Sequence, residues 1–326
     1  MRKIVLTGGL GFIGSHLVDR LLKEDYQVSI LDDFATGHIQ NVASHEKDAR
    51  LTISRASILD KPRLDKVVSD ADAVVHLAAL TSVARSSKEP LLVHDVNVTG
   101  TLNLLECCVE HSVEKFVFIS SAAVYGNRTS PPFREDQSLH PLSVYGSSKA
   151  AGEAYCEAYH ETHRLDAVVI RLMNVYGPRR SAGPYAGVMM NFAEAVEKKN
   201  PILIHGDGEQ TRDFTYATDA AEAIFLALKH EQAAGEIFNV GTGIPCTVNR
   251  LAELFLKVSN SRLSTVHGPA RKGDVRESFG DIAKAQSILN YHPKISLEDG
   301  LKFFLSWYRE TFSTEPEENS PVNPKA

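Results

Sequence analysis

Cysteine is scarce in this chain, which has only four among its 326 residues: Cys107, Cys108, Cys156 and Cys246. They form no C-x-x-C pair and no cluster with histidine at the spacing of metal ligands. The pattern therefore gives no sign of a disulfide framework or of a metal site. We expect reduced structural thiols, as in a cytoplasmic protein.

Long hydrophobic runs and an excess of positive charge are also missing. No apolar run reaches the roughly 18 residues of a membrane span. The apolar stretch at the N-terminus is too short for a signal peptide. With a formal net charge of −6, the chain lacks the excess of positive charge that is typical of nucleic-acid-binding proteins. We therefore expect a cytoplasmic protein that binds neither membranes nor nucleic acid, with one large or two modest globular domains.

What the chain does contain is a glycine-rich turn in its first residues, within KIVLTGGLGFIGSHL. An apolar run typical of a buried strand precedes the turn, and helical periodicity begins at Ile13. The turn carries glycines at three-residue spacing, namely Gly8, Gly11 and Gly14. The first permits a tight turn, the second lets the backbone approach a pyrophosphate, and the third lets the helix pack close to the strand. The phosphates would lie at the helix N-terminus, where backbone N–H groups point outward.

An acidic residue ends the next strand. Residues 28–31 are apolar enough for a second buried strand, and Asp32 follows them, 18 residues after Gly14. A carboxylate at this position can hydrogen-bond an adenosine ribose. It would repel a 2′-phosphate, and no arginine follows it before Arg50. The sequence therefore predicts NAD rather than NADP as the cofactor.

Strands alternate with helices through the first half of the chain. We predict strands at 73–77, 115–120 and 168–172, with helices at 98–111 and 149–163 between them. This alternation predicts an α/β fold with a doubly wound parallel sheet of the Rossmann type. Ligands bind beyond the carboxyl ends of such strands. The informative residues do follow predicted strands: Gly8, Asp32, Ala78, Ser121 and Asn174.

The second half of the chain has a different pattern of predicted elements. A loop-rich stretch at 177–187 precedes helices at 188–199, 218–230 and 247–258 and strands at 202–205, 214–216 and 237–240, and Thr247 opens the last helix. We predict a smaller α/β substrate-binding domain interleaved with the first. The dinucleotide-binding domain would span 1–173 with a returning segment near 214–240, and the second domain would span 174–213 and 241–312. Residues 313–326 are polar and proline-rich, so we expect disorder there.

Tyr145 and Lys149 form a Y-x-x-x-K motif. Their spacing places both on one face of a helix. A nearby ammonium lowers the pKa of a phenol, and such a tyrosine can remove a hydroxyl proton as hydride leaves the carbon. Ser121 follows the predicted strand 115–120, and its hydroxyl could share a hydrogen bond with the substrate oxygen and the tyrosine. The same hydroxyl could instead cap a local turn.

The motifs as a set resemble those of the extended short-chain dehydrogenase/reductases and, more narrowly, of the UDP-hexose 4-epimerases. They are T-G-G-x-G-F-I-G-S, H-L-A-A, V-N-x-x-G-T, S-S-A-A-V-Y-G, Y-G-x-S-K and R-x-x-N-V-Y-G-P, and the resemblance runs from residue 3 to about residue 310. It implies Ser121, Tyr145 and Lys149 as the catalytic residues. It also implies contacts to NAD from Gly8, Gly11, Phe12, Ile13, Gly14, Asp32, Asp33, Ile58, Leu77, Ala78, Ala79, Asn97, Tyr145 and Lys149.

Two positions near the cofactor need comment. The family commonly shows G-D-I or G-D-V at the adenine pocket, whereas this chain has Ala56, Ser57 and Ile58 there. This departure affects the adenine contact but not the prediction of the cofactor itself. His76 lies in an apolar strand, so we interpret it as a packed core histidine rather than a catalytic one.

The resemblance also implies a nucleotide-sugar site in the second half. The implied substrate-binding residues are Ser121, Tyr145, Asn174, Arg212, Arg271, Asp274 and Ser278. Arg212 and Arg271 would bind the diphosphate, for which the planar fork of a guanidinium is well suited, and Asp274 would bind a ribose. Surface charge pairs are the alternative for these arginines. We interpret Arg179 and Arg180 as solvated or rim residues.

The activity implied is epimerisation at C4 of a UDP-hexose, UDP-glucose or UDP-galactose, through a transient 4-keto sugar. Nucleotide-sugar 4,6-dehydratases and decarboxylases carry an acidic residue just after the catalytic serine or threonine, whereas this chain has Ala122 and Ala123. A 4-ketohexose reductase stays open and would consume nicotinamide stoichiometrically. A non-catalytic NAD-binding scaffold is a distant alternative, against which the complete Ser–Tyr–Lys set argues.

Two finer properties follow from the resemblance. The helices at 98–111 and 149–163 would form a four-helix homodimer interface, unless their small and apolar residues are buried within one subunit. These residues are Leu102, Leu105, Val109, Ala150, Ala151, Ala154 and Tyr155. Ser278 stands where a tyrosine closes the sugar pocket in the family, so we predict room for an N-acetyl group and use of UDP-GlcNAc and UDP-GalNAc. Arg276 could fill part of that space, and Ser278 could instead face water.

Overall fold

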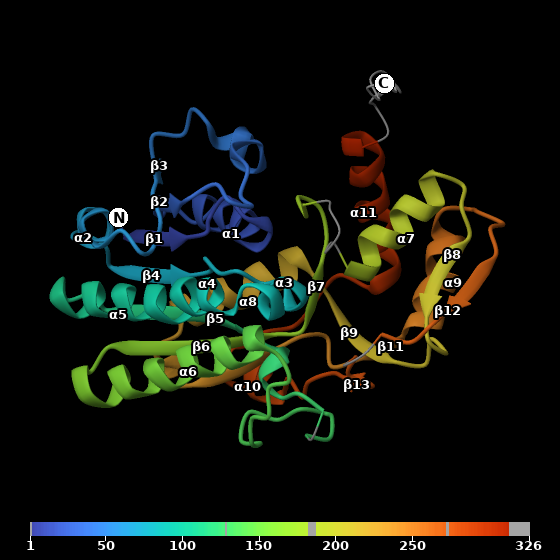
Figure 1. Ribbon diagram of the computed structural model, residues 1–326. Coiled ribbons are helices and arrows are strands. Elements are labelled where there is room, and N and C mark those ends of the chain that lie inside the picture. The colour runs from blue at the N-terminus through green and yellow to red at the C-terminus, as the bar shows by residue number, and fades with distance from the viewer. Residues whose placement is uncertain (1, 128, 182–186, 272–273, 313–326) are drawn as a thin grey trace, which may run out of the picture.

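The computed structural model describes residues 2–127, 129–181, 187–271 and 274–312, and its centre is a seven-stranded parallel sheet (Figure 1). The strand order is β3-β2-β1-β4-β5-β6-β10. The strands are β1 (Lys3–Thr7), β2 (Gln27–Asp32), β3 (Leu51–Arg55), β4 (Ala73–His76), β5 (Lys115–Ser121), β6 (Asp166–Leu172) and β10 (Ile237–Val240). The predicted doubly wound α/β fold is confirmed. Because the strand order reverses between β1 and β4, a ligand crevice is expected at their carboxyl ends.

Helices cover both faces of this sheet, which is why its strands are nearly continuous apolar runs. One face packs against α2 (Lys61–Val68), α5 (Gly100–Glu110) and α6 (Val144–His163). The other packs against α1 (Phe12–Leu22), α8 (Ala217–Lys229) and α10 (Ala283–Leu289). Figure 1 shows α5 and α6 in front of the sheet and α8 behind it. The sheet is thus the middle layer of three, and its strand ends stay open for a site.

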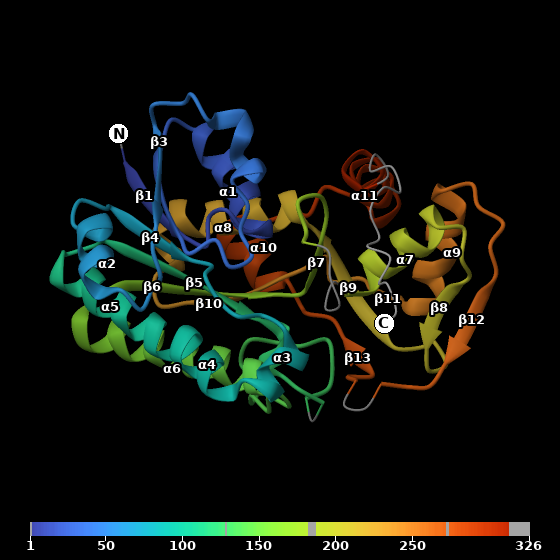
Figure 2. The same ribbon diagram turned by 45° about the horizontal axis from the view of Figure 1, so that its top comes forward.

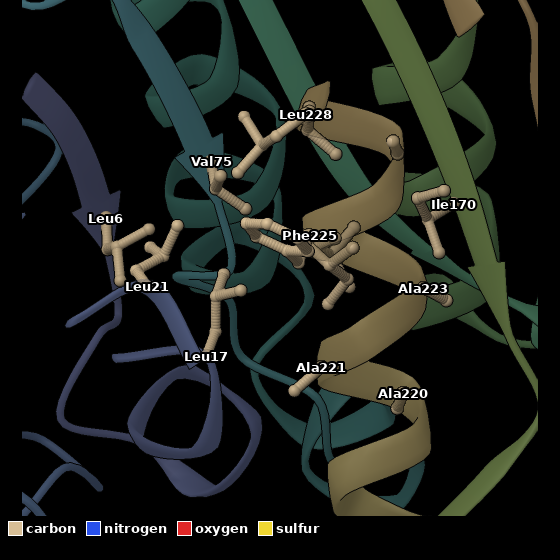
Figure 3. Packing of buried hydrophobic residues seen from close by; sticks show 14 of the residues in the cluster. Leu6, Leu17, Leu21, Val75, Ile170, Ala220, Ala221, Ala223, Phe225 and Leu228 are labelled. Carbon is tan, nitrogen blue, oxygen red and sulfur yellow. The ribbon is translucent and has the colours of Figure 1, made fainter. Parts of the chain in front are cut away.

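The packing between α1, α8 and the sheet is shown in Figure 3. Phe225 of α8 points toward Leu17 and Leu21 of α1. All three side chains are 2% exposed or less. Burial of each such side chain contributes about 1.5–3 kcal/mol. These contacts fix the helix that carries the glycine-rich turn.

A second group of smaller sheets lies beside the large one (Figures 1 and 2). In one sheet β9 (Thr211–Tyr216) pairs with β7 (Asn174–Tyr176), β11 (Pro245–Thr247) and β13 (Glu277–Ser278), and in another β8 (Ile202–His205) pairs with β12 (Thr265–Gly268). The helices α7 (Gly187–Glu197), α9 (Val248–Val258) and α11 (Leu297–Phe312) pack with them around a separate core. Thr247 caps α9, as predicted, by accepting from Arg250 N at 3.1 Å.

The chain returns to the large sheet through α8 and β10. The sequence places this return near 214–240, whereas residues 214–216 belong to β9 in the small sheet. The division into two domains with these boundaries stays a prediction. The segment 313–326, for which the sequence predicts disorder, lies outside the described residues.

Two helices differ in extent from the prediction. The helix expected at 149–163 begins earlier, as α6, because the Ser143 hydroxyl accepts from Gly146 N at 3.0 Å and caps it. The helix expected at 98–111 is α5, and α4 (Pro90–His94) and a π-helical turn at Asp95–Thr99 precede it. Such single π turns often occur at functional sites. Among the described helices, none is long and apolar enough to cross a membrane.

Candidate active site

The glycine-rich turn connects β1 to α1 at the strand-order reversal. Gly8 has a φ of +73°, and a Cβ placed on it would lie 2.7 Å from the backbone N of Ala78. A Cβ on Gly14 would collide with Gly8 O, so α1 packs on the turn only with glycine there. Gly11 is the N-cap of α1, and no described side chain caps that end of the helix. The first-turn amides, including those of Phe12 and Ile13, therefore suit an anionic diphosphate.

Asp32 is held in place by the turn itself. Its two carboxylate oxygens accept from Leu10 N at 3.0 Å and Phe34 N at 2.9 Å. Burial raises the pKa of Asp32, and these two hydrogen bonds oppose that rise. A carboxylate fixed in this way at the end of β2 fits an adenosine ribose. Asp33 is exposed and accepts from Ala35 N at 2.9 Å.

The residues around the expected adenine pocket are also placed. Ile58 is 4% exposed, and a Cβ on Gly100 would lie 2.7 Å from its Cγ1. The hydroxyl of Ser57, where the family has an aspartate, accepts from Leu59 N at 3.2 Å. Ser57 therefore stabilises a local turn, and Ile58 is buried against the start of α5.

His76 at the end of β4 is fully buried. Its Nδ1 pairs with Thr7 Oγ1 at 2.7 Å and its Nε2 with Thr101 Oγ1 at 3.0 Å. Burial, assisted by the charge of Lys149, lowers the pKa of His76 to about 3. The imidazole of His76 is therefore neutral and hydrogen-bonded at both ring nitrogens, and it links β1, β4 and α5. This agrees with its interpretation as a packed core histidine.

Asn97 lies in the π-helical turn and is 1% exposed. Its side chain exchanges two hydrogen bonds with the backbone of Leu80, at 2.8 and 3.0 Å. It also donates to Ser148 Oγ at 2.9 Å. Asn97 therefore fixes the loop after β4, which contains Leu77, Ala78 and Ala79, against the helix that carries Tyr145. The family resemblance implies that these loop residues contact the cofactor.

Ser121 and Tyr145 are brought together at the end of β5 and the start of α6. The Ser121 hydroxyl lies near enough to the Tyr145 phenol to lower the pKa of Tyr145. The Ser121 oxygen accepts a hydrogen bond from Ala123 N at 3.2 Å, so it also caps a local turn. This is the alternative role that the sequence leaves open for Ser121. Tyr145 is 8% exposed. A serine hydroxyl and a tyrosine phenol placed together in this way can pass a proton to or from a substrate hydroxyl.

Lys149 lies one turn after Tyr145 in α6 and is 3% exposed. Its ammonium donates to Ile119 O at 2.7 Å and stands 4.7 Å from the centre of the Phe118 ring. Burial lowers the pKa of Lys149 to about 8, whereas the charges of Cys156 and Glu153 act in the opposite direction. The lysine thus keeps its proton at neutral pH and loses it under mildly alkaline conditions.

The electrostatics of Tyr145 differ from the sequence expectation. The motif predicts that Lys149 lowers the pKa of the phenol, yet burial raises the pKa of Tyr145 and the Ser121 hydrogen bond only partly opposes this. The physical reason is desolvation, which disfavours the phenolate. Tyr145 in this buried setting therefore stays a neutral phenol at neutral pH.

The predicted substrate residues gather at the small sheet. Arg212 in β9 donates from Nη1 to Val275 O at 2.8 Å, and from Nη2 to the carboxylate of Asp274. Ser278 in β13 is the register partner of Arg212 and is half-buried. Burial lowers the pKa of Arg212, and the Asp274 carboxylate opposes this. The structure thus brings Arg212, Asp274 and Ser278 to one place.

Asn174 and Arg271 are less constrained. Asn174 is exposed at the start of β7, which runs beside β9. Arg271 is also exposed, and its carbonyl accepts from Asp274 N at 3.3 Å. Both side chains have the solvent access that a diphosphate ligand requires.

The interpretation of Arg179 and Arg180 as solvated or rim residues is wrong. Arg179 pairs with Asp19 of α1 at 2.8 Å, and only a quarter of its side chain is exposed. Arg180 donates to Val175 O at 3.0 Å, and its guanidinium lies over the ring of Phe12. Two adjacent arginines in a loop look solvated because the sequence does not show that the loop docks on α1.

Sequence reasoning missed the buried ion pair between Arg171 in β6 and Glu153 in α6, at 2.7 Å. Two signals could have found it. Arg171 is a charge inside an otherwise apolar strand, and Glu153 lies four residues after Lys149 on the same helix. A charge in a buried strand requires a partner, so the pair could have been sought.

Comparisons with known proteins agree with this geometry. A family described as GDP-mannose 4,6 dehydratase matches residues 5–303. A putative UDP-glucose 4-epimerase of Methanocaldococcus jannaschii is 37% identical over 95% of this chain and 100% of its own length. The UDP-glucose 4-epimerase of Thermotoga maritima, solved with UDP-glucose, is similar with a TM-score of 0.89 and 37% identity, over 95% of this chain and 99% of that one.

A third similar protein differs in its sugar. The UDP-glucuronic acid 4-epimerase of Bacillus cereus, solved with UDP-glucuronic acid and NAD, has a TM-score of 0.89 and 33% identity, over 94% of this chain and 99% of that one. Similar proteins therefore bind NAD and act on different nucleotide sugars. At this level of identity, similarity alone does not identify the sugar.

Proposed function

Because the chain belongs to the extended short-chain dehydrogenase/reductase family of NAD-dependent nucleotide-sugar epimerases and dehydratases, we propose that it is a UDP-glucose 4-epimerase. It would interconvert UDP-glucose and UDP-galactose through a transient 4-keto sugar. Support comes from two similar proteins, from Methanocaldococcus jannaschii and Thermotoga maritima, that bear this name at 37% identity.

The observation that carries the choice of reaction is the pair Ala122 and Ala123. They stand in the short 3₁₀ helix directly after Ser121. Elimination of water or carbon dioxide requires a further acid or base beside the sugar. An alanine side chain offers neither, whereas Ser121 and Tyr145 suffice to remove and return the proton of one hydroxyl. This favours epimerisation over dehydration.

The residues that would hold NAD are those of the turn and its neighbours. Gly8 and Gly14 let the turn and α1 pack closely, and Gly11 leaves the N-terminus of α1 without a side-chain cap, where the diphosphate would lie. Asp32 would accept a hydrogen bond from the adenosine ribose. NAD, when bound, supplies the hydride acceptor and donor. Lys149 would bind the nicotinamide ribose from its buried position at Ile119 O.

Tyr145 would act as the base and acid for the C4 hydroxyl. The neighbouring Ser121 hydroxyl would orient the phenol, and a substrate hydroxyl could take the place of the local cap on Ser121. A phenol held neutral by burial needs a nearby cation to deprotonate, and Lys149 one turn away can provide it. Arg212, Arg271, Asp274 and Asn174 would bind the UDP and leave the sugar free to rotate.

The direct test is to incubate the protein separately with UDP-glucose and with UDP-galactose. We expect both reactions to reach the same mixture of the two sugars, with no net change in nicotinamide absorbance, because the cofactor is regenerated in each turnover. Stoichiometric reduction of added NAD⁺ to NADH, with formation of a 4-keto sugar, would instead identify a ketoreductase that runs in reverse on these alcohols. Formation of a 4-keto-6-deoxy sugar would identify a dehydratase, and either result would contradict the proposal.

We also propose a homodimer. The candidate interface residues on α5 and α6 divide into two groups. Leu105 is fully buried within its own subunit, so its assignment to an interface is wrong. The others are half-buried or exposed, namely Leu102, Val109, Ala150, Ala151, Ala154 and Tyr155. Leu91 of α4 adds an apolar side chain that is 79% exposed.

Such a face is expected to pair with a second copy. Light scattering at micromolar concentration should give twice the mass of 35.8 kDa. Leu91→Glu should shift the distribution toward the monomer, whereas Ile244→Glu, at an exposed position outside α4, α5 and α6, should not. A monomeric wild-type protein would refute the dimer.

The location of the enzyme stays a prediction. All four cysteines lie within the described residues and are free. This agrees with the cytoplasmic location expected from the sequence, and with turnover of a nucleotide sugar there.

A further inference from the structure

The buried ion pair between Arg171 and Glu153 has no role in the chemistry described above. The two side chains are 3% and 4% exposed, and Arg171 Nε donates to both carboxylate oxygens at 3.1 Å. Such a pair often adds no more stability than apolar residues of the same volume, because desolvation offsets the attraction between the charges. Stability alone therefore gives no reason for the pair to stand here.

Glu153 connects the pair to the catalytic strand end. Its carboxylate accepts from the hydroxyl of Ser120, the residue before Ser121. Glu153 also lies two turns after Tyr145 on α6. One carboxylate thus ties the end of β5 to the helix that carries the catalytic tyrosine.

Arg171 connects the pair to the substrate side through a chain of hydrogen bonds. Its Nη1 donates to Tyr125 OH at 2.8 Å, and Tyr125 OH donates to Asn239 Oδ1 at 2.8 Å. Asn239 Nδ2 donates to Phe133 O at 2.7 Å. The backbone of Phe133 then bonds to residues 279–281, donating to one carbonyl at 2.9 Å and accepting from one amide at 2.8 Å.

The chain of contacts is rigid along its length. Tyr125, Phe133 and Asn239 are all 1% exposed or less, and the rings of Tyr125 and Phe133 stack at 4.5 Å. A Cβ on Gly280 would lie 2.6 Å from Met173 Cε, so residues 279–281 are closely packed as well. Residues 279–281 directly follow Ser278, at the proposed sugar pocket.

We propose that Glu153 and Arg171 are positioning residues, whose ion pair keeps Ser121 and the sugar-side segment 278–281 at a fixed spacing. The proposal rests on the proposed epimerase function. An epimerase must present both faces of a rotating 4-keto sugar to the same hydroxyl groups. The distance between Ser121 and the pocket wall at 278–281 must therefore stay fixed. A misplacement of about 1 Å can cost about 10²-fold in rate.

The first test is Tyr125→Phe, which removes the hydroxyl between Arg171 and Asn239 and leaves the ion pair intact. We expect kcat/KM for UDP-glucose to fall about tenfold or more, mainly through KM, because the segment 278–281 is loosened. The matched control is Tyr291→Phe. Tyr291 is fully buried too, and its hydroxyl donates to Gly241 O at 3.0 Å.

The second test is Ser120→Ala, which cuts the link to the strand end. We expect kcat to fall about tenfold with KM unchanged, because Ser121 alone is affected. The matched control is Ser29→Ala, at another buried serine in a strand of the same sheet. A merely structural role would lower the stability of test and control variants alike and leave both kinetic constants unchanged.

Kinetic constants within about twofold of the matched controls for both Tyr125→Phe and Ser120→Ala would overturn the proposal. Amide hydrogen exchange separates this failure from failure of the proposed function. If the wild-type protein turns over no UDP-hexose, the function is wrong, and faster exchange at residues 279–281 in Tyr125→Phe than in Tyr291→Phe still supports the positioning role. Equal exchange in the two variants would overturn it.

Discussion

Tyr145→Phe is expected to lower epimerase turnover by about 10²- to 10⁴-fold, the usual contribution of a positioned acid or base. The substitution removes only the phenol hydroxyl, whose pKa the neighbouring Ser121 hydroxyl lowers. Tyr145 is 8% exposed, so its ring should keep its packing in the variant. NAD content and UDP affinity should therefore remain close to those of the wild-type protein.

The measurement is kcat for UDP-glucose, with UDP affinity by calorimetry and bound nicotinamide by release from denatured protein. Tyr26→Phe is a suitable control, because Tyr26 packs against Phe225 on the other face of the sheet. Turnover within about threefold of the wild-type value would contradict the role of Tyr145 as the acid or base. Loss of NAD in the variant would show instead that the phenol is needed for cofactor binding.

Ser278→Tyr is expected to abolish turnover of UDP-GlcNAc and UDP-GalNAc while UDP-glucose and UDP-galactose are still used. Ser278 is half-buried in β13 beside Arg212, so its small side chain should leave space at the sugar. An N-acetyl group requires such space, and one clashing group in a packed site can abolish productive binding. We therefore propose that the wild-type enzyme uses both pairs of substrates.

The structure weakens one objection to this prediction. Arg276 could in principle fill the space beside Ser278, but its side chain is 60% exposed and pairs with Asp207 at 2.7 Å. The test is kcat/KM for both substrate pairs with the wild-type protein, Ser278→Tyr and the control Ser278→Ala. Failure of the wild-type protein to use the N-acetylated pair would refute the prediction. Unchanged use of that pair by Ser278→Tyr would refute it as well.

The sequence alone determined the features that depend on short-range spacing. The three glycines and Asp32 are separated by distances that only a strand, a turn and a helix can satisfy, and the structure has them there. Tyr145 and Lys149 share a helix face because their spacing matches one turn. The alternation of strands and helices likewise predicted the parallel sheet, because parallel strands require a crossover between them.

Only the tertiary structure decided the features that depend on contacts between distant segments. The docking of Arg179 on Asp19, the pairing of Ser278 with Arg212, and the network from Glu153 to residues 279–281 join segments whose proximity follows from the packing of α1, α6 and the small sheet. The raised pKa of Tyr145 has the same origin. A motif shows which charge is near in the sequence, but the desolvation that raises the pKa of the phenol is a property of the folded core.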